Sequence, residues 1–176
     1  MKYFLKRTLA YYIDCFIAFA AIMLVVQWAI LSNIRGALGL TDAWFRNGFN
    51  VELYVLTTIS LPVWMYFIYF DSNKSKGTFG KRWMKLVVVD QQQQKIGLSK
   101  SFLRTFMKLA PWEIIHIGLM LPTPIHYQKE PEIRLVTILG IVLFVGLAVS
   151  ILLNAHKQSL YDRILGTQVI EITHSK

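Results

Sequence analysis

Four long apolar stretches dominate the pattern of hydrophobic and polar positions along the chain. They run over residues 9–31, 51–70, 102–121 and 135–153, with more polar segments between them. A helix needs about 20 mostly apolar residues to cross the hydrocarbon core of a bilayer. The pattern therefore predicts an all-α integral membrane protein with four transmembrane helices.

The stretch 102–121 is the weakest of the four because it contains polar and helix-bending residues: Arg104, Lys108, Pro111, Glu113 and His116. The two basic side chains lie near its start, where they can extend to the membrane interface. The remaining apolar part is short for a span, so we expect this helix to tilt or the bilayer to thin around it. If this segment did not cross, the two ends of the chain would lie on opposite sides.

The first stretch also has some features of a secretory signal peptide. Lys2, Lys6 and Arg7 precede it, and small alanines follow within it. However, Asp14 would interrupt the short apolar region of a signal peptide, and the apolar run continues well beyond the alanines. We therefore expect a retained transmembrane helix.

The basic residues are distributed unevenly among the connections. Residues 1–8 hold three of the 19 lysines and arginines, residues 71–108 hold nine, and residues 154–176 hold three, whereas the two remaining connections hold two each. Cytoplasmic segments of membrane proteins are enriched in Lys and Arg. The pattern predicts a protein of the cell (cytoplasmic) membrane with both termini and the 71–101 loop in the cytoplasm.

The long loop and the tail, residues 71–101 and 154–176, show patterns of ordered structure. Residues 86–90 are rich in valine and predict a strand, residues 91–94 a turn, and residues 95–98 a possible return strand. Residues 167–172 predict another strand, which we expect to pair with 86–90 in a small cytoplasmic β element. The alternative is a disordered tail.

Composition agrees with a membrane location. Hydrophobic residues make up 55% of the 176 residues, more than a soluble domain of this size can bury. The net charge of +9 is confined to loops, so we expect anionic lipid at the cytoplasmic face rather than nucleic acid as its partner. The single cysteine, Cys15, excludes an intrachain disulfide framework.

Three blocks of sequence resemble the RDD family of small membrane proteins. They are residues 6–14 (KRTLAYYID), residues 77–82 (GTFGKR) followed by a valine-rich segment that ends at Asp90, and residues 158–163 (QSLYDR) followed by a Gly-Thr pair. The resemblance implies one RDD-like membrane domain over residues 1–176. It implies that the signature positions include Arg7, Asp14, Gly80, Lys81 and Asp162. Some members of this family resemble cation/proton antiporters in activity, and others are parts of larger assemblies.

Asp14 is the first candidate for proton or cation binding because it lies within an apolar span. A charge there is costly and is expected to face other helices and to find a partner. Ala10 and Ala18 flank it at helical spacing, and we expect this small stripe to face a second stripe on the last helix, formed by Gly146, Ser150 and Asn154.

Both aspartates of the signature also have a purely structural reading. Asp14 could be paired with Arg7 or Arg163, and Asp162 with Lys81 or Arg82.

Glu113 and His116 are the second candidate, with Glu52 as a further ionisable residue within a span. They lie three residues apart on one helical face, a spacing that suits a proton relay or a polar pair within the bundle. Di-iron bundles use this spacing twice and add two more glutamates, and a haem would need a second histidine at matching depth. We therefore expect no metal and no cofactor.

The sequence contains no motif for a catalytic nucleophile, phosphate loop or dinucleotide, so we expect no catalytic residues. The favoured hypothesis is a proton or cation transport protein, or a subunit of one, that forms a homo-oligomer or joins a membrane-protein partner. The second is a non-catalytic scaffold or assembly subunit. The third is a redox or metal enzyme built around Glu113 and His116.

Overall fold

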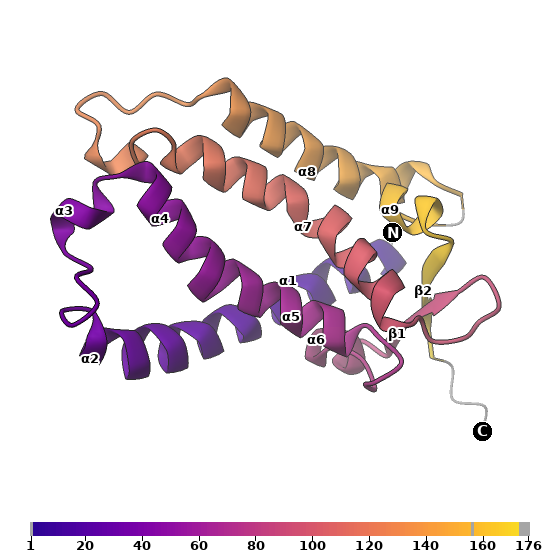
Figure 1. Cartoon of the computed structure of the whole chain (residues 1–176). Coiled ribbons are helices and arrows are strands. Elements are labelled where there is room, and N and C mark those ends of the chain that lie inside the picture. The colour runs from indigo at the N-terminus through magenta and orange to yellow at the C-terminus, as the bar shows by residue number, and fades with distance from the viewer. Residues whose placement is uncertain (1, 156, 173–176) are drawn as a thin grey trace. The chain divides into compact units, whose positions relative to one another are not determined.

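The computed structural model describes residues 2–155 and 157–172, and it is mostly helical with a small two-stranded sheet (Figure 1). The first helix, α1 (Lys2–Ile22), continues without a break through the π-helical segment η1 (Met23–Leu31) into α2 (Ser32–Ile34). The short helix α3 (Asp42–Phe45) precedes a second continuous helical run, formed by α4 (Gly48–Val55), η2 (Leu56–Ser60) and α5 (Leu61–Phe70).

The second part of the chain repeats the alternation of long helices with short elements. It contains α6 (Phe79–Trp83), β1 (Leu86–Asp90), the long helix α7 (Leu98–Met120) and the short 3-10 helix η3 (Ile125–Tyr127). It ends with α8 (Leu135–Leu153), α9 (Leu160–Ile164) and β2 (Thr167–Glu171).

Three helical segments of the described chain are long and apolar enough to cross a membrane: Tyr3–Ile34, Gly48–Phe70 and Leu135–Leu153. They confirm three of the four predicted spans, and the first helix begins earlier and ends later than the apolar pattern indicated. The predicted span 102–121 is a helix, α7, but it is not among the three. Its hydropathy is lowered by the charged residues in it, so the count of four spans is not confirmed.

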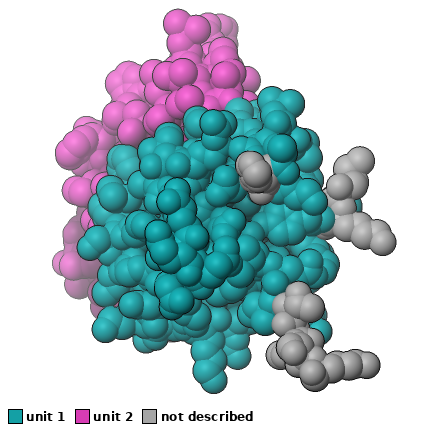
Figure 2. Space-filling view, turned by 90° about the vertical axis from the view of Figure 1, so that its right-hand side faces the viewer, with its two compact units in different colours: residues 1–18, 64–109, 145–176 teal, residues 19–63, 110–144 magenta. Residues whose placement is uncertain are grey.

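The chain divides into two compact units (Figure 2). Unit 1 comprises residues 1–18, 64–109 and 145–176, and contains both strands together with α6 and α9. Unit 2 comprises residues 19–63 and 110–144, and contains only helices and their connections.

The sheet of unit 1 consists of β1 and β2 in antiparallel order, paired from Leu86–Glu171 to Asp90–Thr167. The predicted pairing of the loop with the tail is therefore confirmed. The return strand over 95–98 is wrong, because Lys95 makes only a single bridge to Val89. The inward face of the sheet, with Val88 and Val169, forms a buried apolar cluster with Ala10 of α1.

Unit 2 is held together by helices that approach closely at glycines. A Cβ on Gly118 would lie 2.3 Å from the Thr137 hydroxyl, and a Cβ on Gly140 would lie 2.6 Å from the Ile115 side chain. Small residues allow helix backbones this close, where the dispersion contacts between them are strongest. α7 and α8 therefore pack directly against each other within unit 2.

Candidate functional site

A network of buried ion pairs occupies the interior of unit 1. Its members are three cations and two carboxylates that come from five separate segments: Arg7, Asp71, Lys81, Arg104 and Asp162. All five are buried, with at most 9% of each residue exposed. An isolated charge is costly in such an environment, so the pairing is required for these residues to be buried at all.

Asp162 has every hydrogen-bonding position of its carboxylate occupied. Arg7 donates to one oxygen at 2.8 Å, and Arg104 donates to the other at 3.0 Å. Thr167 donates to the same oxygen as Arg104, and the backbone N–H of Ser159 donates to the oxygen bound by Arg7. Ser159 is also the N-cap of α9, so a capping box fixes the position of this carboxylate.

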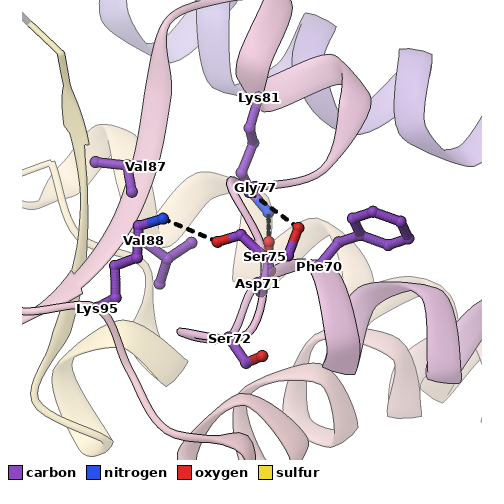
Figure 3. Close-up of a pocket in the computed structure, with 9 residues that line it drawn as sticks. All are labelled: Phe70, Asp71, Ser72, Ser75, Gly77, Lys81, Val87, Val88 and Lys95. Carbon is purple, nitrogen blue, oxygen red and sulfur yellow. Dashed lines mark hydrogen bonds and ion pairs between the residues drawn. The ribbon is translucent and has the colours of Figure 1, made fainter.

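Asp71 lies directly after the end of α5 and receives two cations. Arg104 donates to one of its oxygens at 2.9 Å, and Lys81 forms an ion pair with the other. Figure 3 shows the ion pair of Lys81 and Asp71 beside a small cavity. The cavity has a volume of about 10 Å³, which has room for a single water molecule. On the other side of the cavity, Lys95 donates to the backbone carbonyl of Ser75 at 2.8 Å. Arg104 thus joins Asp71 to Asp162 through different nitrogens.

Both network carboxylates titrate below their ordinary range. Burial alone would raise the pKa of Asp71, but the charges of Lys81, Lys108 and Arg104 outweigh it and lower the pKa. Burial likewise opposes ionisation of Asp162, and Arg104 and Arg7 together hold its pKa well below the ordinary value. Both side chains are therefore charged at neutral pH, as the ion pairs require.

Asp14 is completely buried, and it is held by neutral donors. Its carboxylate accepts hydrogen bonds from the Tyr66 hydroxyl at 2.8 Å, the Thr78 hydroxyl at 2.6 Å and the Gly80 backbone N–H at 2.6 Å. The absence of a side chain at Gly80 permits this approach, because a Cβ there would lie 2.1 Å from the Ala10 carbonyl. The first turn of α6 is thereby anchored on α1.

The ion pairs predicted for the two signature aspartates are wrong in detail. Asp14 is not paired with Arg7 or Arg163, because the loop before α6 supplies its donors, Arg7 binds Asp162, and Arg163 is exposed. Asp162 is not paired with Lys81 or Arg82. Lys81 instead binds Asp71 and is buried.

Three residues of the ion-pair network and the Asp14 contacts were not selected as functional candidates from the sequence: Asp71, Arg104 and Tyr66. A signal for Arg104 exists, because the pair Arg104-Thr105 repeats Arg7-Thr8 near the start of another long helix, and both arginines bind Asp162. Nearby, the buried ammonium of Lys108 lies 3.3 Å from the centre of the Phe67 ring, a cation–π contact.

The predicted packing stripes are only partly used. Ala10 and Ala18 are buried, as close packing requires. Gly146 is exposed, and a Cβ built on it would meet no atom within 4 Å, so it does not make the expected close helix contact. Ser150 instead accepts a hydrogen bond from the backbone N–H of Leu160 at the start of α9, 2.9 Å away, and Asn154 lies just after α8.

A second polar group lies in unit 2 and contains the other candidates, Glu52, Glu113 and His116. The Ser60 hydroxyl donates to Glu113 at 3.1 Å, and Glu113 interacts electrostatically with both Glu52 and His116. One carboxylate oxygen of Glu52 and Nδ1 of His116 are buried and have no hydrogen-bond partner within the described chain. This group is called the unit 2 polar group below.

The unit 2 polar group does not have the geometry of a metal centre. Within residues 2–155 and 157–172, no three His, Cys, Asp or Glu side chains are grouped so that they could hold a metal ion. His116 instead lies against the ring of Trp112, with 5.2 Å between the ring centres.

The comparisons with known proteins agree with the sequence blocks described above. The model of the RDD family matches residues 3–166 of the chain. No curated protein and no solved structure matches it. The matched region includes Arg7, Asp14 and Asp162, the first and last of which are joined by an ion pair in the interior of unit 1. Because the family match extends over nearly the whole chain, this membrane protein belongs to the RDD family.

Proposed function

We propose that this protein transports protons or small cations in an antiporter-like manner, with the unit 2 polar group as the ion-binding site. The observation that carries the proposal is the gathering of Glu52, Glu113 and His116 with unpartnered polar atoms among them. Ionisable groups within apolar spans are costly and mark ion pathways in membrane proteins. A proton or a cation shared by these groups would satisfy the atoms that lack partners.

The closed ion-pair network of unit 1 supports this choice of site. Asp14 and Asp162 have their oxygens occupied by donors from the protein itself. A transported ion would have to displace these donors at considerable cost. We assign Asp14, Asp162 and their partners to holding the fold, and the unit 2 polar group to the ion.

A fourth span is part of the proposal, because Glu113 and His116 lie on α7. This helix has 23 residues, which corresponds to about 34 Å at 1.5 Å per residue, enough to cross the hydrocarbon core. The charge of Arg104 in its first half is neutralised by Asp71 and Asp162. Its second half packs along the apolar helix α8. The proposal includes four spans with both termini in the cytoplasm and the protein in the cell membrane, and the enrichment of Lys and Arg in the terminal segments and the 71–101 loop supports this orientation.

A chain of four helices is small for a complete transport path, so the proposal includes a homo-oligomer. The exposed faces of α8 are apolar and carry no charge. These faces can contact lipid or another copy of the chain.

Flux measurements in proteoliposomes test the function. We expect an imposed pH gradient to dissipate when Na⁺ or K⁺ is added outside, and we expect Glu113→Gln and Glu52→Gln to abolish the dissipation. Glu130→Gln and Glu132→Gln are matched controls, because both glutamates are exposed in the connection before α8. Thermal melts in detergent establish that the inactive variants are folded. Absence of cation-dependent flux in the wild-type protein would refute transport, and unchanged flux in both site variants would refute the site.

The alternative function is a membrane scaffold or assembly subunit, and the rigidity of unit 1 favours it. The ion-pair network fixes α6, α9 and the sheet to the helices, and exposed basic residues surround them, among them Lys74, Lys76 and Lys95. Such a surface suits an acidic protein partner. Crosslinking in native membranes tests this alternative: a specific partner that is lost with Lys74→Glu/Lys76→Glu supports it, and crosslinks only between copies of the chain count against it.

A further inference from the structure

Two segments far apart in the sequence have the same local design in unit 1. Each consists of a five-residue helix, a two-residue turn and a five-residue strand: α6 with β1, and α9 with β2. The residue before each helix is a hydroxyl residue in extended conformation, Thr78 or Ser159. The residue before each strand has a positive φ, 55° at Lys85 and 59° at Gly166. These two units are called the helix–turn–strand segments below.

The sheet relates the two helix–turn–strand segments by an approximate two-fold axis. Val88 is the third residue of β1, Val169 is the third residue of β2, and these two residues pair with each other at the centre of the ladder. The first residue of each strand pairs with the last residue of the other. Equivalent positions of the two segments therefore have equivalent places in the ladder, so their features can be compared position by position.

The two short helices share their pattern of exposure. In both, the second and third residues are buried, whereas the first, fourth and fifth are exposed. The exposed residues are two large apolar side chains and one arginine in each case: Phe79, Arg82 and Trp83 in α6, and Leu160, Arg163 and Ile164 in α9. Trp83 is 74% exposed and Ile164 is 60% exposed.

Both short helices are attached to membrane-spanning helices inside the ends of those spans. In α6, the backbone N–H of Phe79 donates to the Tyr66 hydroxyl of the second span, and that of Gly80 donates to Asp14 of the first. In α9, the backbone N–H of Leu160 donates to Ser150, which lies three residues before the end of the last span. These attachments favour a position of the exposed apolar side chains at the depth of the membrane interface.

From these contacts we infer that α6 and α9 are interfacial helices that together bind anionic lipid of the bilayer. Their apolar side chains enter the boundary between headgroups and acyl chains, where amphipathic helices bury such groups. Arg82 and Arg163 contact the phosphate groups of the lipid, since guanidinium groups bind phosphate with two hydrogen bonds at once. Trp83 occupies the level of the headgroups, where tryptophan is enriched in membrane proteins.

The charge and the apolar surface identify lipid as the occupant. An acidic protein would satisfy the arginines but would not require two large apolar side chains beside each of them at the depth of the spans. The inference concerns unit 1 and is independent of the proposed transport, which relies on the unit 2 polar group.

Lipid titrations of the purified protein test the role of the arginines. Native mass spectrometry measures the binding of phosphatidylglycerol and of phosphatidylcholine to the detergent-solubilised protein. We expect phosphatidylglycerol to bind more tightly, and we expect Arg82→Gln and Arg163→Gln each to weaken it by roughly fivefold, the factor for one basic residue near an anionic surface.

Arg35→Gln and Arg46→Gln are the matched controls for this titration. Both arginines are exposed, and each lies over an aromatic ring as Arg82 lies over Phe79. They belong to unit 2 and are expected to leave phosphatidylglycerol binding unchanged. Equal losses for control and test variants, or no preference for phosphatidylglycerol in the wild-type protein, would overturn the inference.

Depth-dependent quenching tests the position of α6 separately from its charge. The protein is reconstituted into bilayers that contain lipids brominated near the headgroup end of the acyl chain, and the wild-type fluorescence is compared with that of Trp83→Tyr. We expect the difference signal, which reports Trp83, to be quenched by the brominated lipid and protected from aqueous iodide. Quenching by iodide alone would place α6 in water and refute the interfacial position.

Discussion

At the scale of single residues, each buried carboxylate of unit 1 requires hydrogen-bond or ion-pair partners, because burial of an unpaired charge is costly. Asp14 is stabilised by three neutral donors, whereas Asp71 and Asp162 are stabilised by cations. The difference in partners arises because different segments of the chain lie next to each aspartate. The loop before α6 presents a hydroxyl and backbone N–H groups to Asp14, and α7 presents a guanidinium that reaches both other aspartates.

Removing one donor from Asp14 is expected to destabilise the protein. In Tyr66→Phe, the carboxylate loses the hydroxyl 2.8 Å away, and a hydrogen bond to a charged group is worth about 1.5–3 kcal/mol. Tyr69→Phe is the control, because Tyr69 is exposed three residues later in the same helix. Thermal or denaturant unfolding in detergent measures the free energy difference. Equal stability of the two variants would show that the Asp14 contacts contribute little.

At the scale of elements, the position of α6 depends on close backbone contact with α1. Gly80 makes this contact possible, and its N–H reaches Asp14 only because no side chain separates α6 from Ala10. The same principle operates in unit 2, where Gly118 and Gly140 bring α7 and α8 together. Glycines at crossing points, rather than large complementary side chains, therefore set the spacing of several elements.

Adding a methyl group at this contact is expected to displace α6. In Gly80→Ala, the Cβ would lie 2.1 Å from the Ala10 carbonyl, a clash that only a backbone shift can relieve, at a cost of about 1–3 kcal/mol. Gly146→Ala is the control, since a Cβ there meets nothing within 4 Å and alanine favours the helix. Unfolding measurements on both variants check this, and a neutral Gly80→Ala would contradict the tight contact.

At the scale of the whole molecule, the two units differ in how their buried polar groups are satisfied. In unit 1, Arg7, Asp71, Lys81, Arg104 and Asp162 form ion pairs, and Asp14 is held by neutral hydrogen-bond donors. Unit 2 retains buried polar atoms without hydrogen-bond partners on Glu52 and His116. The ion-pair network and the unit 2 polar group are thus located in different units of the chain.

Stability of the whole molecule is expected to depend on pH through Asp71 and Asp162. Both have a folded-state pKa below the ordinary value of 3.8, so their ionised forms stabilise the folded protein above that pH. Below about pH 4 the unfolded chain binds protons more readily than the folded one, and stability falls as the pH decreases. Melting temperatures in detergent from neutral to acidic pH measure this. A melting temperature that stays constant below pH 4 would contradict the ion-pair network.

The sequence by itself determined the membrane class, three spans, the paired strands and the family, because these depend on local patterns. Apolar runs of about 20 residues, valine-rich segments and short signature blocks are visible without knowledge of distant contacts. Glu52, Glu113 and His116 were also selected from the sequence as candidates, since ionisable residues are conspicuous in apolar surroundings, and their role stays a prediction.

Only the tertiary structure decided which charge meets which. Arg7 was one of two candidate partners for Asp14, yet Arg7 binds Asp162, 155 positions away. Lys81 was a candidate partner for Asp162 and binds Asp71 in the interior instead. The choice among partners depends on long-range packing and on the cost of leaving any buried charge unpaired, and neither quantity is contained in the local pattern of residues.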